Sequence, residues 1–184
     1  MTIGLYMTSS LGVPRDQRPG DRRSHVNAAA AKLTDPQIAH IVVTADDGDI
    51  ANAKQALQKS QNAEVQRFAH RMIADHGSVN DQAVALAKKL KITPEDNPTS
   101  KSLKDAQDAN RTKLNALSGA AFDKAYADNE AAYHKSVDDA LSNTLIPDAQ
   151  NAELKSLLEN GLKIFQDHLR DAQNMVKELS VAHQ

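Results

Sequence analysis

The sequence predicts an all-α protein: a four-helix up-down-up-down bundle with an extra short helix before the third long helix and a disordered N-terminal tail. Helix-forming residues dominate the composition, and only 7 Gly and 6 Pro interrupt the 184 residues. Apolar residues recur at spacings of three and four along four long segments, which is the period of an amphipathic helix. No segment shows the alternation of a strand, so we expect every element to be helical.

The composition excludes several classes of protein. The chain has no cysteine, which excludes disulfides, thiolate metal sites and thiol catalysis. A formal net charge of −2 argues against nucleic acid as a partner, because binding phosphates needs a basic surface. No stretch is long and apolar enough to be a transmembrane segment. We find no diagnostic catalytic motif, so an enzyme is not the expectation, and the length predicts one domain.

Residues 1–33 differ from the rest of the chain. They contain Pro14, Pro19, Gly20 and several arginines without an apolar period. We interpret them as a disordered tail or the remnant of a targeting segment, and we place the bundle domain at residues 34–184. The apolar start of the chain precedes the arginines, whereas an ordinary signal peptide has its positive residues first.

The first helix is expected over about residues 36–59. Pro36 suits a first helical turn, and Thr34 or Asp35 before it can cap that turn. Its apolar stripe has one polar member, because Asp49 falls on the apolar side of the helix.

The second helix is expected over about residues 62–91 and has the clearest apolar period in the chain. His76 lies in the middle of the apolar stripe, whereas His70 points toward solvent. We expect four of the seven histidines to be surface or tail residues: His25, His40, His70 and His183.

The segment from Leu103 to residue 143 is expected to form two helices. A short helix is carried by apolar residues from Leu103 to Leu117, and Ser118-Gly119 breaks it. A long helix follows over about residues 120–143, with Glu130 and His134 on one face. The last helix begins near residue 151 after the loop at Pro147, and it carries His168 on its apolar face.

The inward polar residues are predicted to lie at one level of the bundle. At about 1.5 Å of rise per residue, Asp49, His76, His134 and His168 fall within roughly 6–9 Å in height. Glu130 lies one turn from His134 on the same face. The estimate requires the break before the third long helix, with the short helix packing across the bottom of the bundle.

Three imidazoles with one or two carboxylates suit one divalent transition metal: Zn, Fe, Mn, Cu or Ni. The candidate ligands are His76, His134 and His168, with Asp49 or Glu130 completing the set. Bundle cores are a recurrent place for such sites. Three aspartates beside the histidines are candidate outer partners: Asp75, Asp138 and Asp171.

Other interpretations remain open at this point. The histidines and carboxylates can form a hydrogen-bonded polar layer that fixes helix register without any metal, in a structural or partner-binding bundle. Taken alone, Asp49 suits the edge of the core, and Glu130 suits an exposed position beside Tyr133. The buried histidines can also act as an acid sensor. We reject a calcium loop at residues 46–49, because they lie within a helix and lack the distal glutamate.

Several short stretches resemble a known bacterial family, the domain of unknown function 4142, over about residues 36–178. The stretches that carry the resemblance are Ala45-Asp46, Asp49-Ile50, Val65 to Ala69, Met72, Asp75-His76, Phe122 to Tyr126, Tyr133-His134 and Phe165 to Leu169. The resemblance implies a ferritin-like fold and an exported or outer-membrane-associated protein, and it supplies no activity. The family commonly has Glu where this chain has Asp49. Because Glu130 precedes His134 by four residues rather than three, the Glu-x-x-His pattern of a di-iron oxidase is absent.

The function expected from these observations is metal handling or stress protection by a soluble bundle that binds one metal ion. The resemblance implies a periplasmic or exported location, whereas the given N-terminus, if genuine, implies the cytoplasm. We expect a monomer or small homo-oligomer and can name no protein partner.

Overall fold

A computed structural model of the protein describes residues 32–181. Within that range every element is helical and no strand is present, as expected. The elements in chain order are α1 (Asp35–Lys59), α2 (Ala63–Leu90), α3 (Pro98–Asn115), α4 (Gly119–Ala140), the π-helical turn η1 (Leu141–Leu145), α5 (Ile146–Asp148) and α6 (Ala152–Val181). The segment interpreted as a tail lies almost entirely outside the described residues. None of the described helices has the length and apolar character needed to cross a membrane.

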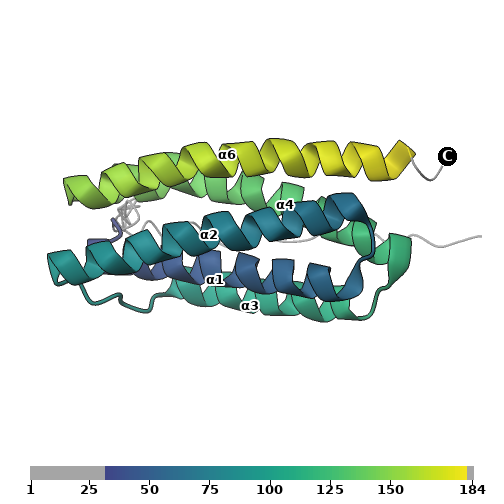
Figure 1. Cartoon of the computed structure of the whole chain (residues 1–184). Coiled ribbons are helices and arrows are strands. Elements are labelled where there is room, and N and C mark those ends of the chain that lie inside the picture. The colour runs from purple at the N-terminus through teal and green to yellow at the C-terminus, as the bar shows by residue number, and fades with distance from the viewer. Residues whose placement is uncertain (1–31, 182–184) are drawn as a thin grey trace, which may run out of the picture. The chain divides into compact units, whose positions relative to one another are not determined.

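The long helices pack lengthwise as a bundle (Figure 1). Helix α1 packs on α2, α2 on α6 and α6 on α4, while α3 lies along the outer side of α1. The buried apolar residues form two clusters, one around Phe68, Met72 and Phe122 and the other around Ile38 and Leu158. A layer of buried polar side chains lies between them, so the bundle places its polar residues at mid-height.

The direction of α4 differs from the prediction. The ammonium group of Lys59, at the end of α1, donates to the carbonyl of Asn115, at the end of α3 (2.8 Å). At the other end of the bundle, the amides of Gln150 and Asn151 donate to Asp35 (2.8 and 3.0 Å). Helix α4 therefore starts beside the α1–α2 turn and runs parallel to α2. The four long helices run up-down-down-up, and the predicted up-down-up-down order is wrong.

Helix α3 explains this difference. It was expected to cross the bottom of the bundle, but it runs along α1 for its whole length and carries the chain back to the end where α2 began (Figure 1). The predicted break after it is confirmed. Gly119 has a φ of 54°, in the left-handed region that favours glycine, and this residue separates the two helices.

The start of α1 follows the predicted capping. Thr34 accepts the amide of Gln37, and the Gln37 side chain accepts the amide of Thr34, which completes a capping box. At the far end of α4 the α-helix stops at Ala140, earlier than the predicted end near residue 143, and continues as η1. The wider π turn carries two buried leucines, Leu141 and Leu145, into the apolar cluster around Ile38 and Leu158.

Candidate metal centre

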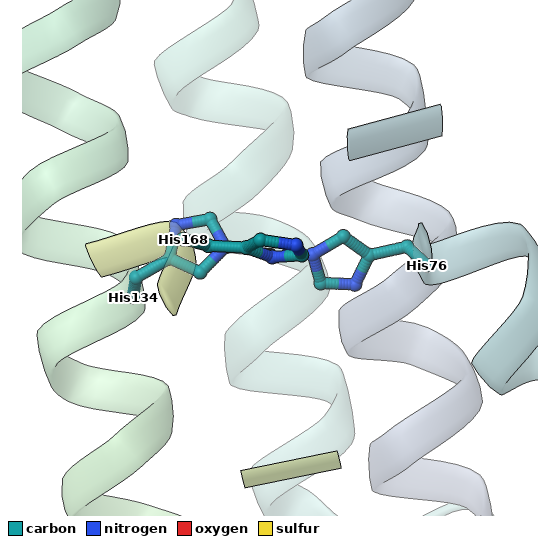
Figure 2. Close-up of side chains that lie close together, drawn as sticks. All are labelled: His76, His134 and His168. Atoms are coloured by element: carbon teal, nitrogen blue, oxygen red, sulfur yellow. Dashed lines mark hydrogen bonds between the residues drawn. The ribbon is translucent and has the colours of Figure 1, made fainter. Parts of the chain in front are cut away.

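Three buried imidazoles meet between α2, α4 and α6 (Figure 2). One ring nitrogen from each of His76, His134 and His168 lies within 4.8 Å of the other two. Two carboxylic residues complete the cluster, because donor atoms of Asp49 from α1 and Glu130 from α4 lie within the same distance of His134. All five side chains are buried. The structure thus brings together all five residues that the sequence analysis named.

The donor atoms around Asp49 have the spacing of a metal site. Its Oδ2 lies 2.8 Å from Nε2 of His76 and 3.8 Å from Nε2 of His134. The two Nε2 atoms are 3.4 Å apart. Four ligands held tetrahedrally at about 2.0–2.1 Å from zinc lie about 3.3–3.4 Å from one another. The observed separations bracket that value, so one ion can contact all three atoms with small adjustments of the side chains.

In each histidine, the ring nitrogen that faces away from the other two imidazoles contacts a hydrogen-bond partner. Nδ1 of His76 contacts Oδ1 of Asp46 (2.7 Å), and Nδ1 of His134 contacts the carbonyl of Glu130 (3.0 Å). Nε2 of His168 contacts Oδ2 of Asp75 (2.8 Å). When these nitrogens donate, the opposite nitrogen of each neutral ring keeps a lone pair. Such outer partners orient metal-binding histidines and fix their tautomers.

The inward nitrogen of His168 gives the plainest sign of a missing partner. Its Nδ1 is buried and forms no hydrogen bond. An unpaired buried polar atom is costly in a protein core. An ion bound to this nitrogen would remove that cost.

A chain of charged residues leads from His168 to the surface. Asp75, the outer partner of His168, also accepts from Nε of Arg71 (3.2 Å), and Arg71 pairs in turn with Asp171. The predicted role of Asp75 as an outer partner is therefore confirmed. Asp171 reaches Arg71 rather than a histidine. Asp138 contacts no histidine, and both its carboxylate oxygens are buried without a partner, so that prediction is wrong.

The charges of the cluster are arranged around His76. Burial lowers the pKa of this imidazole, but the carboxylates of Asp49 and Asp46 outweigh burial and raise the pKa to about 10. Burial raises the pKa of Asp49, and the neighbouring His76 more than reverses that effect and lowers it. Burial lowers the pKa of His134, and it lowers that of His168 to about 4. Without metal, His76 is thus an imidazolium held between two carboxylates, and the other two rings are neutral.

Glu130 differs in charge from Asp49. Burial and the negative charge of Asp49 raise the pKa of Glu130 well above its usual range. The protonated carboxyl of Glu130 donates a hydrogen bond to Asp49. The expectations that Asp49 lies at an edge and Glu130 at an exposed position are wrong, because both are fully buried.

Asp46 is the site residue that the sequence analysis missed. It lies three residues before Asp49 on α1, a spacing that places both side chains on one helical face. That spacing is the signal in the sequence that indicates a site residue, because the rejected calcium loop and the family resemblance assign no ligand role to Asp46. Burial raises its pKa, and its bond to His76 opposes the rise.

Helix α3 closes one side of the site. The amide of Gln107 donates to the hydroxyl of Tyr133 (2.9 Å), which donates to the carbonyl of Ala45 (2.9 Å). Gln107 lies directly over Gly48, where a Cβ atom would overlap its amide. Glycine at this position of α1 therefore allows α3 to cover the cluster.

The remaining histidines lie away from the cluster. His70 is exposed on α2, and His40 is partly exposed on α1, with its Nδ1 4.0 Å from Asp96. The prediction of surface positions is thus confirmed for His70, and His40 is intermediate. His25 and His183 lie outside the described residues.

Comparison with known protein families identifies the family of the chain. The sequence profile of a family described as a domain of unknown function (DUF4142) matches residues 21–175. No curated protein and no solved structure gave a significant match.

Proposed function

The chain belongs to the DUF4142 family of domains of unknown function, and from this premise we propose that it binds one divalent transition-metal ion in the bundle core. The ligands are the inward nitrogens of His76, His134 and His168 and the carboxylate of Asp49. The observation that carries the proposal is the pairing of each imidazole with an outer partner, which leaves the inward nitrogens of the three rings, within 4.8 Å of one another, as the donors for an ion.

Glu130 supports this site without being a ligand. Its protonated carboxyl donates to Asp49 and so fixes the orientation of the carboxylate. Loss of that proton would allow Glu130 to join the ligand set in place of Asp49 or beside it. The chemistry of three imidazoles and one carboxylate suits Zn, Fe, Mn, Cu or Ni.

The burial of the site favours metal handling or stress protection over catalysis. Catalytic zinc sites keep one coordination position open to water or substrate, whereas structural sites are filled by protein ligands. Here the proposed ligands are four protein side chains, and the five side chains of the cluster are fully or almost fully buried. An ion held there is sequestered from solvent and stabilises the bundle.

A ferritin-like classification and an exported location complete the proposal. A four-helix bundle with one long crossover is the topology of ferritin-like folds, and α3 lies in such a crossover between α2 and α4. The periplasmic location rests on the family resemblance, with the cytoplasm as the alternative.

One observation favours a second candidate, a structural bundle with no metal. His76 as an imidazolium already has both nitrogens bonded to carboxylates, at 2.7 and 2.8 Å. A proton on His76 then replaces the ion, and the layer serves only to fix the register of the helices. This candidate predicts that added metal leaves the melting temperature unchanged.

Elemental analysis of protein purified without a His-tag tests the proposal. We expect one transition-metal ion per chain in the wild type and none in the variant His76→Ala/His134→Ala/His168→Ala. The matched control is His70→Ala, which removes an exposed histidine from the same helix as His76 and should keep the metal. Equal metal content in the wild type and the triple variant would overturn the proposal.

A further inference from the structure

A cavity of about 180 Å³ lies beside the metal centre, in the half of the bundle that holds η1. Its walls come from α1, α2, α4, η1 and α6, and the start of α3 covers its outer side. The main wall residues are apolar: Ile41, Val79, Leu141, Leu158 and Phe165. A lining made mostly of aliphatic and aromatic side chains offers few partners to ordered water, which needs two to four.

Two features of the backbone keep this space open. Gly161 on α6 lines the cavity, and a Cβ atom added there would meet nothing closer than 3.5 Å, an ordinary contact distance with Phe165. Packing therefore does not require glycine, although glycine within a helix is unfavourable relative to alanine. The opposite wall contains Leu141 and Leu145 of η1, and π turns inserted in α-helices occur frequently at functional sites.

The cavity shares a wall with the metal centre. The ring of Phe165 stacks on His76, with centroids 4.6 Å apart and an angle of 9° between the planes. Asp46, the outer partner of His76, and Tyr133, bonded to Gln107, also border the cavity. A molecule in the cavity would therefore contact the side chains that hold His76 in place.

The cavity reaches the surface between α3 and α4. Three of its lining residues are exposed: Thr99 on α3 and Ser136 and Ala140 on α4. Helix α3 packs mainly on α1 rather than on α4, so a small displacement of its first turns would widen this opening.

From these observations we propose that the cavity binds a small, uncharged, apolar molecule of about the size of one aromatic ring. An engineered apolar cavity of about 150 Å³ is known to stay dry and to bind benzene, and this cavity has a similar volume and a similar lining. Charged molecules are excluded, because their burial without a partner is costly. The inference does not depend on whether the neighbouring site holds metal.

Titration calorimetry with toluene as the probe tests the proposal. We expect saturable binding of one toluene per chain to the wild type, and binding of phenol at least about tenfold weaker, because its hydroxyl would lose its hydrogen bonds to water. The Gly161→Leu variant should abolish toluene binding by filling the cavity. The matched control, Gly77→Leu, adds the same side chain to α2 where no atom lies within 4 Å, and it should bind toluene as the wild type does.

A smaller substitution covers the case in which Gly161→Leu does not fold. Gly161→Ala adds one methyl group at an ordinary contact distance, so it should fold, as checked by circular dichroism, and should bind toluene more weakly than the wild type. Absence of toluene binding to the wild type, unchanged binding to Gly161→Ala and Gly161→Leu, or equal affinity for phenol would overturn the proposal.

Discussion

Nε2 of His76 and Oδ2 of Asp49 lie 2.8 Å apart at the centre of the bundle, where both side chains are shielded from water. This contact joins α1 to α2. In the metal-free protein it is an ion pair between the imidazolium of His76 and the carboxylate of Asp49. The same two atoms are the pair that a bound cation would bridge. The contact therefore determines both the stability of the metal-free bundle and its affinity for metal.

The Asp49→Asn substitution should destabilise the metal-free protein. Removing one partner of a buried ion pair typically costs about 3–5 kcal/mol. Asp46 still compensates part of the charge of His76, so we expect a loss at the lower end of that range. Urea denaturation of the metal-free protein should show this loss in the free energy of unfolding. Asp47→Asn, at an exposed position two residues away, is the control and should change it by less than about 1 kcal/mol. Equal effects of the two substitutions would contradict the buried pair.

The stability of the metal-free protein should fall on the acid side because of His168. Its pKa lies near 4 in the folded protein and near 6.5 when unfolded, so the unfolded chain binds the proton first as the pH falls. The contribution of neutral His168 is complete above pH 6.5 and is lost between pH 6.5 and 4. At about 1.4 kcal/mol per pKa unit, the loss is roughly 3 kcal/mol.

The stability should also fall on the alkaline side because of His76. Its folded pKa of about 10 exceeds the usual 6.5, so its contribution is complete below pH 6.5 and is lost as the pH rises toward 10. Chemical denaturation from pH 4 to 10 should show an alkaline fall that is missing in His76→Gln and an acid fall that is smaller in His168→Gln, where only His134 still contributes to it. Profiles of the two variants that parallel the wild type would contradict both assignments.

Replacing the buried Asp138 should stabilise the protein above pH 6. Burial and the neighbouring Asp139 raise the pKa of Asp138 to about 6, and its oxygens have no hydrogen-bond partner. A raised carboxyl pKa means that stability is lost as the pH rises from 3.8 through 6. At pH 8 the Asp138→Asn variant should therefore gain about 1–2 kcal/mol. Asp139→Asn leaves the buried carboxylate in place and loses an exposed ion pair with Lys135, so it should gain less than Asp138→Asn, and an equal gain in both variants would contradict the prediction.

A larger residue at Gly48 should displace the side chain of Gln107. The Gly48→Ala substitution places a methyl group where the amide of Gln107 lies, so this amide must move and give up its hydrogen bonds to Tyr133 and Ala45. We expect a loss of about 1–3 kcal/mol, the usual cost of overpacking, measured by thermal denaturation. Gly77→Ala on α2, where a Cβ atom meets nothing within 4 Å, should instead stabilise the helix by up to about 1 kcal/mol. A Gly48→Ala variant as stable as Gly77→Ala would show that α3 does not rest on this position.

The shared level of the histidines was predictable because it depends on helix length more than on direction. His134 lies fifteen residues from Gly119, so it falls near the middle of the bundle whichever end α4 starts from. The direction itself was not predictable, because nothing in the sequence of α3 indicates whether it crosses the bundle or runs along α1. Apolar periodicity indicates which face is buried and contains no information on which neighbour covers it.

The failure to predict Asp46 as a site residue has a related cause. Asp46 belongs to a run of three aspartates around a glycine, and sequence alone does not distinguish the exposed Asp47 from the buried Asp46 and Asp49. Their burial depends on Gln107 and Tyr133, which come from helices far along the chain. The protonation of Glu130 is similarly a product of tertiary contact with Asp49.

X-ray absorption spectroscopy at the zinc edge, on protein loaded with one equivalent of Zn(II), tests the central claim most directly. The account predicts three imidazole nitrogens at about 2.0–2.1 Å and one carboxylate oxygen at a similar distance, with no water in the first shell. The spectrum of His70→Ala should be unchanged, and that of His168→Ala should lose one imidazole. A shell of mostly water oxygens, or a spectrum unaltered by His168→Ala, would contradict a metal site in the bundle core.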